Sequence, residues 1–223
     1  MTLDHLILAG PELNELAQLV RERLGIEPVV GGRHIGHGTH NALLGLGSGR
    51  YLELLAPDPQ GAGGSFSDAI AHVRDPALHT WCASRGAADD VAERVRAVGC
   101  VVRRLGMNRR LSDGSLLEWE LVFVEGHPYG TLVPFFIDWR GSEHPSTKLK
   151  GGAQLEELVL AHPDPGGLAE LLDSLGGLPL EARVEGARGA GLRASLRYGP
   201  RSAVFHGLAH EGGATDPPTD PAP

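Results

Sequence analysis

The sequence predicts an α+β fold built from repeated βαβββ modules, with mixed, curled sheets and helices on the outside. Two observations predict it. Three segments, which begin at residues 3, 78 and 155, share one pattern of a short apolar run followed by an amphipathic stretch. Each segment is then followed by three more strand-like runs, most of which end near glycine or proline. A repeat of this length indicates one supersecondary unit that the chain uses several times.

The amphipathic stretch of each repeat is typical of a helix. In the first repeat the apolar side chains recur at three- and four-residue steps, which places them on one helix face: Leu13, Leu16, Ala17, Val20 and Leu24. Gly25, Gly99 and Gly176 stand where a left-handed cap would end the three helices. The strands that we expect after these helices cover residues 27–30, 39–46 and 51–56, then 100–104, 116–125 and 131–139, and finally 181–185, 192–198 and 202–205.

The repeat also predicts how the chain divides. Modules one (residues 1–60) and two (76–147) are expected to pair into a cup over residues 1–147, and residues 153–208 form a third module. The tail, residues 209–223, is rich in proline, glycine and aspartate and is expected to be disordered. Since two modules complete a cup, the third sheet needs a cover. It either meets its counterpart in a second chain through residues 155–207, giving a homodimer, or caps the first two modules within one chain.

Composition excludes several classes of function. The net charge is −8 with acidic and basic residues intermixed, so no basic stripe for nucleic acid is present. No apolar run approaches the ~18 residues that a membrane span needs, and no secretory leader is evident. Cys82 and Cys100 do not form a CxxC pair, so we expect two thiols rather than a disulfide or a structural zinc, and a cytoplasmic protein.

The opening run LDHLILAG and the closing run YLELLAP of the first module resemble those of the vicinal-oxygen-chelate superfamily, which includes glyoxalase I, extradiol dioxygenases and fosfomycin- and bleomycin-resistance proteins. Residues 32–57, Trp81 and residues 134–146 resemble more narrowly the glyoxalase-like domain proteins. The resemblance covers about residues 3–207. It implies a cup into which the first and fourth strands of each module project metal ligands, but the superfamily hosts isomerases, lyases, oxygenases and plain binders.

Carried onto module one, the resemblance implies that His5 and Glu53 are ligands of a divalent metal ion and the catalytic pair. Imidazole and carboxylate suit such an ion chemically. Glu53 is also notable by itself, because a carboxylate inside an apolar strand is costly unless it is paired or coordinated. The alternative is a salt bridge from Glu53 to Arg33 or Arg50.

Module two departs from the superfamily pattern. Alignment of its strands with those of module one places Thr80 or Trp81 opposite His5, and Phe136 opposite Glu53. None of the three is a convincing ligand. Asp138 shares a face with Phe136 in a strand, so it is a tentative third ligand.

Other residues are candidates for binding the substrate. His34, His37 and His40 lie in a glycine-rich stretch that reads as the rim of a pocket, and His40 with Asn41 is nearest to a strand. Arg109, in a loop, is a candidate clamp for an anionic ligand. The full set of substrate-binding candidates comprises His40, Asn41, Trp81, Trp119, Phe136 and Arg109.

These residues support three hypotheses of different classes. The first is a metal-assisted lyase or isomerase that acts on a small oxygenated molecule. An oxygenase fits less well, because the triad of two histidines and one carboxylate lacks a convincing second histidine. The second is a metal-free module that binds a small molecule in an apolar cup, as a resistance protein does. The third is a structural role with a filled cup.

Overall fold

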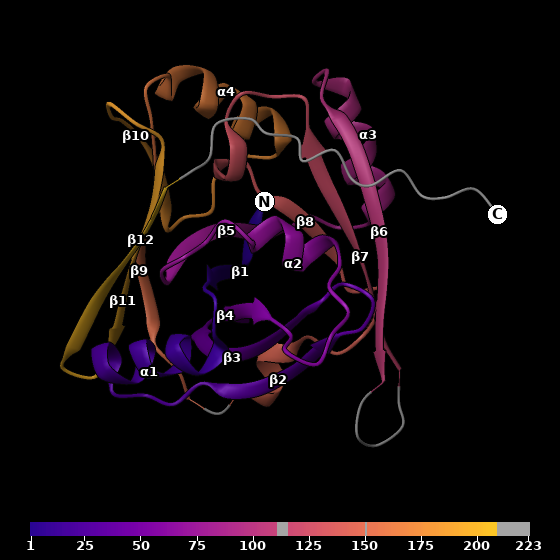
Figure 1. Ribbon diagram of the computed structural model, residues 1–223. Helices are drawn as coiled ribbons and strands as arrows, with labels where there is room; N and C mark the ends of the chain where they lie inside the picture. Colours follow the sequence, from indigo (N-terminus) through magenta and orange to yellow (C-terminus); the bar gives the residue numbers. More distant parts are fainter. Residues whose placement is uncertain (111–115, 150, 209–223) are drawn as a thin grey trace.

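The computed structural model of this chain describes residues 1–110, 116–149 and 151–208. Within these ranges the strands form an eight-stranded sheet in the order β2-β3-β4-β1-β5-β8-β7-β6 and a four-stranded sheet in the order β10-β9-β11-β12 (Figure 1). Parallel and antiparallel pairs occur in both sheets. The predicted fold class, α+β with mixed curled sheets and outer helices, is confirmed. None of the described helices is long and apolar enough to cross a membrane.

Module one follows the predicted order of elements: β1 (Thr2–Ala9), α1 (Leu13–Leu24), β2 (Val29–His34), β3 (Thr39–Gly47) and β4 (Arg50–Pro57). Helix α1 ends at Gly25, which has a left-handed φ of 74° and donates its N–H to the carbonyl of Arg21. Strand β1 pairs in parallel with the last strand, β4, so the opening and closing runs of the module lie side by side. This pairing brings His5 and Glu53 to neighbouring strands.

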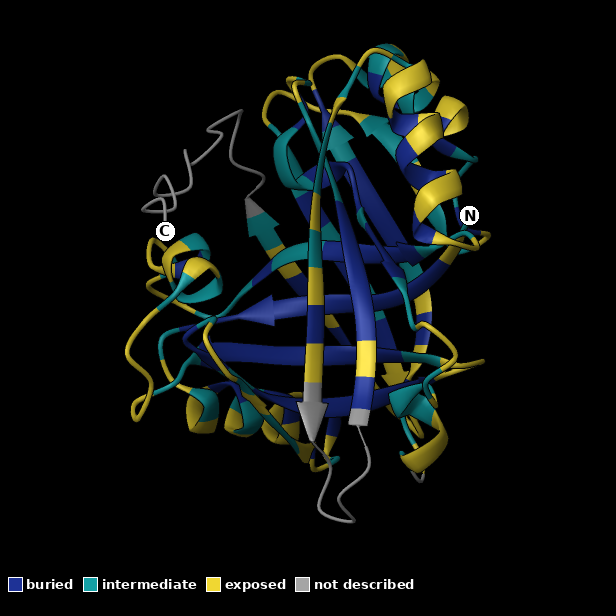
Figure 2. Ribbon diagram, turned by 90° about the vertical axis from the view of Figure 1, so that its right-hand side faces the viewer, coloured by how far each residue is buried: buried dark blue, intermediate teal, exposed yellow. Residues whose placement is uncertain are grey.

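Module two repeats this pairing after a short helix, α2 (Ser65–Ile70). Its elements are β5 (Ala77–Ser84), α3 (Ala88–Ala97), β6 (Val101–Arg110), β7 (Leu116–Glu125), the 3-10 turn η1 (Gly130–Leu132) and β8 (Phe135–Asp138). Strand β5 pairs in parallel with β8, and the antiparallel pair β1–β5 joins the two modules. Figure 2 shows the β6–β7 ribbon crossing in front of the other strands of the sheet. The sheet therefore curls, and we call its concave face the cup.

The third unit keeps the order of elements but not the strand pairing. It contains the turn η2 (Pro145–Lys148), β9 (Gln154–His162), α4 (Pro165–Leu175), β10 (Ala182–Gly186), β11 (Gly191–Tyr198) and β12 (Arg201–Leu208). Strand β9 pairs in parallel with β10, the first strand after the helix, and antiparallel with β11. In modules one and two the parallel partner is the last strand instead. The third unit thus differs from the other two in topology.

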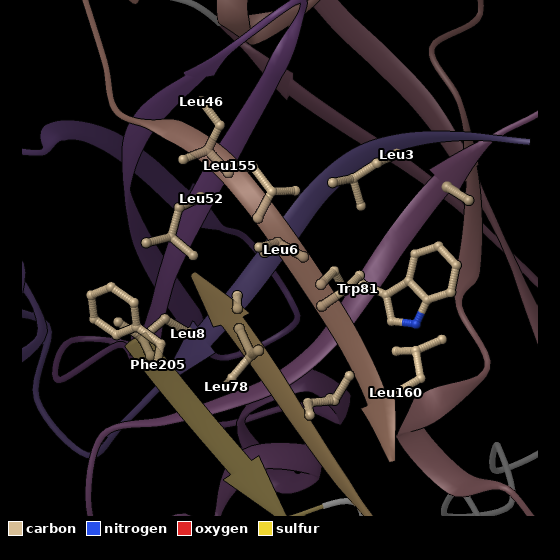
Figure 3. Close-up of a cluster of buried hydrophobic side chains, with 14 of the residues drawn as sticks. Leu3, Leu6, Leu8, Leu46, Leu52, Leu78, Trp81, Leu155, Leu160 and Phe205 are labelled. Atoms are coloured by element: carbon tan, nitrogen blue, oxygen red, sulfur yellow. The ribbon is translucent and has the colours of Figure 1, made fainter. Parts of the chain in front are cut away.

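The third unit covers the convex face of the large sheet within the same chain. Leu155, Leu160 and Phe205 from the small sheet belong to one buried cluster with Leu6 and Trp81 from the large sheet (Figure 3). Helices α1 and α3 contribute to the same cluster. The small sheet therefore has its apolar cover without a second chain.

The opposite face of the small sheet is polar. Arg183 pairs with Glu157 and Glu185 there, and Arg197 pairs with Glu156. Exposed ion pairs contribute little to stability, but they keep such a face solvated. The homodimer through residues 155–207 stays a prediction. The tail, 209–223, lies outside the described residues.

Candidate functional site

The cup holds a cavity of about 890 Å³, counting the part that is open to solvent. One end is polar and is formed by module one: His5, His34, Asn41, Tyr51 and Glu53. The opposite wall is apolar and comes from β7 and β8: Leu117, Trp119, Leu121, Phe123, Phe135 and Ile137. Helix α2 adds Phe66 and Ile70. A cavity of this size and lining suits a small molecule with an apolar body and a polar group, and it weakens the hypothesis of a filled cup.

His5 is held in a defined orientation by its neighbour in the sequence. The β1–β5 pairing skips one residue between Leu3 and His5, so Asp4 occupies a β-bulge. The bulge lets the Asp4 Oδ1 atom reach the Nδ1 atom of His5 at 2.8 Å. The His5 ring also stacks on Tyr51, with ring centroids 4.7 Å apart and planes 16° from parallel. With Nδ1 bonded to the carboxylate, Nε2 is the ring nitrogen that faces Glu53.

The second oxygen of Asp4 is also bonded. Oδ2 accepts a hydrogen bond from Trp139 Nε1 at 3.0 Å and lies 3.3 Å from Nε2 of His144. Burial by itself raises the pKa of Asp4, but the hydrogen bonds from His144, His5 and Trp139 and the charge of His5 outweigh it. The net result is a pKa well below its ordinary value near 3.8. Asp4 therefore stays ionised and fixes the tautomer of His5.

The lowered pKa of Asp4 predicts a pH dependence of stability. A carboxyl group whose pKa is lower in the folded state stabilises the fold above its unfolded pKa, and this stability is lost as the pH falls through the folded value. Below pH 4 the wild type should therefore lose stability with an added slope of up to ~1.4 kcal/mol per pH unit. Asp4→Asn should lack this component and lose about 2 kcal/mol at pH 7. Urea unfolding of both proteins at pH 7, 5 and 3 measures the difference, and parallel curves would contradict it.

Glu53 is buried at the polar end of the cup without a guanidinium or ammonium partner among the described side chains. Its Oε1 atom accepts a hydrogen bond of 2.6 Å from Asn41 Nδ2, and its Oε2 atom lies 3.6 Å from Nε2 of His5. The predicted alternative, a salt bridge to Arg33 or Arg50, does not form. Arg33 pairs with an aspartate at 2.5 Å, and Arg50 pairs with a glutamate of the third unit.

The donor set around Glu53 fits a divalent metal ion. With Nδ1–H of His5 donating to Asp4, a ring that carries no proton on Nε2 presents a lone pair there, and Nε2 faces Oε2 of Glu53. Two such acceptors in a buried site need a proton or a cation between them. Ligands of one ion at bond lengths of about 2.1 Å lie roughly 3.0–3.4 Å apart, close to the 3.6 Å seen here. The Asp4–His5 bond matches the support that metal-binding histidines receive.

A second grouping of metal-ligand residues lies behind this pair. The ligand atoms of Asp4, His5 and Cys82 all lie within 4.8 Å of one another. Both Asp4 oxygens are already bonded. Burial, with the charges of Asp4 and Glu53, raises the pKa of the Cys82 thiol well above its ordinary value. A thiol in its protonated form is a poor ligand, so we assign Asp4 to the orientation of His5.

Trp81 and Phe136 do not face the cup, so their predicted orientation is wrong. Both side chains point to the convex side and are almost completely buried in the main core cluster, where Trp81 donates to the carbonyl of Leu132 at 2.8 Å. The cup-facing residues of β8 are Phe135 and Ile137 instead. An error of one residue in aligning a strand moves every side chain to the other face. Trp119 lines the cup, and its role in substrate binding stays a prediction.

Asp138 also points away from the cup, so its prediction as a metal ligand is wrong. Its Oδ2 atom accepts the backbone N–H of Ala88 at 3.0 Å, which caps the N-terminus of α3. His40 lies on β3 next to Asn41, so strand alternation places it on the face opposite to the cup, and it is not among the lining residues. Asn41 lines the cup, and its role in substrate binding stays a prediction. The side chain of Arg109 lies outside the described residues.

Two residues of the site, Asp4 and His144, were not predicted, and His34 was expected only at the rim of a pocket. Asp4 adjoins His5 in a strand, so alternation alone places it on the opposite face, and only the bulge changes this. His34 ends β2 and lines the cup, although its glycine-rich surroundings read as a loop. His144 follows β8 in a connection and reaches Asp4 through the tertiary fold. The sequence did contain one signal for Asp4: it forms an ionisable pair with His5 inside an otherwise apolar run.

Comparisons with known proteins agree with this fold. A family model described as a glyoxalase-like domain matches residues 3–176. A hypothetical protein from Staphylococcus aureus is similar in structure, with a TM-score of 0.63 and 16% identity over 93% of this chain and 85% of that one. A variant of 4-hydroxymandelate synthase from Streptomyces coelicolor has a TM-score of 0.52 and 12% identity over 93% of this chain and 62% of that one.

Methylmalonyl-CoA epimerase from Streptomyces coelicolor is a further structural neighbour, with a TM-score of 0.45 and 21% identity over 65% of this chain and 99% of that one. A comparison with curated proteins found no match. The identities to the solved structures show a shared fold only. The family model, in contrast, spans both modules of the cup and reaches into the third unit. The chain therefore belongs to the glyoxalase-like domain family.

Proposed function

We propose that this protein is a metal-assisted lyase or isomerase that acts on a small oxygenated molecule bound in the cup. The observation that carries the proposal is the approach of His5 Nε2 to Glu53 Oε2, 3.6 Å apart at the polar end of an apolar cavity. A divalent ion bound there would polarise a carbonyl or enediolate oxygen of the substrate. His5 and Glu53 are the residues that would hold it.

The chain's own groups are arranged for proton transfer. The Glu53 carboxylate lines the cavity, and its oxygen that does not hold the ion would take a proton from the bound molecule and return it. Asn41 supports the carboxylate form of Glu53 by donating to Oε1, and Asp4 keeps Nε2 of His5 directed at the same place. The apolar wall around Phe135 orients the rest of the molecule and excludes water, which strengthens these interactions.

Metal content tests this proposal. Mass spectrometry of the purified wild type should find about one equivalent of a divalent metal, either as isolated or after incubation with manganese, iron, nickel or zinc. His5→Ala should lose it, because it removes one of two ligands. His40→Ala is the matched control, since His40 lies on β3 of the same sheet but on the other face, and it should keep the metal. A metal-free wild type after all four incubations would contradict the proposal.

A metal-free binding module is the second candidate, and the apolar wall favours it. The superfamily resemblance implies further metal ligands on the last strand of module two. In this chain that strand, β8, presents Phe135 and Ile137 to the cup instead. Such a cup would bind an apolar ligand by burial of its surface alone. The two candidates differ in one result. Binding of a fluorescent apolar probe that is unchanged by a chelator, with no bound metal in the wild type, would favour the binding module.

A further inference from the structure

His5 and Glu53 supply only two ligands, whereas catalytic sites for divalent transition metals commonly use three protein ligands. The described residues of module two that line the cup near them are apolar, apart from Thr80 and His79 on β5. His79 has the ring of His72 as its neighbour, 5.7 Å away between centroids. If a third ligand exists, module one is therefore the place to look for it.

His34 has the position and the tautomer for that role. It ends strand β2, its side chain is 11% exposed, and its Nε2 atom lies 3.8 Å from Glu53 Oε1. Its ring edge contacts Phe66 of α2, which helps to hold the ring over the cup. Glu53 thus has an imidazole Nε2 near each of its two oxygens, from His5 on one side and from His34 on the other.

The hydrogen bonds around Asn41 decide which nitrogen of His34 carries the lone pair. The Asn41 Oδ1 atom accepts the backbone N–H of Gly32 at 2.8 Å, so the amide nitrogen must face the site. That nitrogen donates to Glu53 at 2.6 Å and lies 3.4 Å from Nε2 of His34. Since Asn41 offers a donor there, Nε2 is the acceptor, and Nδ1–H donates to the buried hydroxyl of Thr39 at 2.9 Å. The lone pair of His34 therefore points into the site.

We infer that His34 is the third protein ligand of the metal ion, so that module one alone supplies the set of two histidines and one carboxylate: His5, His34 and Glu53. This inference rests on the proposed function, because it needs an ion between His5 and Glu53. The two separations from Glu53, 3.6 and 3.8 Å, exceed the spacing of bound ligands, and the ligand atoms of His5, His34 and Glu53 are not all within 4.8 Å of one another, so both rings would have to move inward to hold one ion. Two imidazoles with one carboxylate select a first-row divalent transition ion over magnesium or calcium, and three ligands leave positions for substrate oxygens.

Titration with Co²⁺ or Zn²⁺, followed by calorimetry and by the visible spectrum of Co²⁺, tests the inference. His34→Gln should weaken metal binding by more than ~100-fold, beyond the 10- to 100-fold loss that an outer partner of a ligand causes. His37→Gln is the matched control. His37 lies in the turn that follows β2 and also contacts Phe66, but it bonds to Ser65 rather than facing Glu53, and its variant should bind like the wild type. A loss of 100-fold or less in His34→Gln overturns the inference.

A measurement on the wild type guards against a variant that fails to fold. X-ray absorption of the Zn²⁺-loaded protein should count two imidazole ligands, and one imidazole overturns the role of His34. The outcomes separate the two proposals. A wild type that binds no metal overturns both. A wild type that binds metal through one imidazole, with His34→Gln unchanged, overturns only the inference about His34.

Discussion

Gly207→Ala is expected to destabilise the protein by about 3 kcal/mol and to lower Tm by roughly 6–12 °C. Gly207 lies on β12, where the small sheet contacts β5 of the large sheet. A Cβ atom at this position would lie 1.6 Å from the carbonyl oxygen of Leu78 and 2.6 Å from its carbonyl carbon. Because both are backbone atoms of a central strand, no side-chain rotation relieves the clash. The two sheets must separate locally.

Gly189→Ala is the matched control for this prediction. A Cβ atom at Gly189 meets no other atom within 4 Å, so this variant should be neutral or slightly stabilised through the entropy of the unfolded chain. Thermal and urea unfolding of the wild type and both variants compare the two positions. A loss of less than ~1 kcal/mol in Gly207→Ala would show that the third unit does not dock closely on β5.

The fold could be predicted from the sequence because its signal is local and repeated. The apolar faces of the three helices and the glycines that end them, Gly25 among them, depend only on neighbouring residues. The strand pairing of the third unit could not be predicted in this way. Whether β9 takes β10 or the last strand as its parallel partner depends on the surface it covers, here the convex face with Leu6 and Trp81.

The candidate site could be predicted for one half only. His5, Glu53 and Asn41 lie on regular positions of paired strands, and the repeat assigns their face. The bulge at Asp4 adds one residue to β1 and breaks the regular alternation of side chains between the two faces of the sheet. In β8 the predicted alignment with β4 is wrong by one residue. The neighbours of Phe136, and not Phe136 itself, therefore face the cup. Both errors concern register, which the sequence of a single strand does not determine.

Glu53→Gln is expected to weaken metal binding by more than ~100-fold and yet to leave the metal-free protein as stable as the wild type, or up to about 1 kcal/mol more stable. The amide oxygen of glutamine can still accept the hydrogen bond of Asn41, which reaches Oε1 at 2.6 Å. Its amide nitrogen then donates toward Nε2 of His5, where the wild type has two acceptors 3.6 Å apart. The substitution therefore removes a ligand and places a hydrogen-bond donor beside Nε2 of His5.

Glu120→Gln provides the matched control for Glu53→Gln. Both glutamates lie in the large sheet and are 7% exposed. Glu120, however, pairs with Arg104 at 2.6 Å and with Arg140, so its loss should destabilise the fold by about 1–3 kcal/mol and leave metal binding unchanged. Urea unfolding in the presence of a chelator, together with metal titration, gives both readouts. If Glu53→Gln loses as much stability as Glu120→Gln, Glu53 has a structural role. A residue that is kept for its chemistry is often retained at a cost in stability, so its removal should not destabilise the fold.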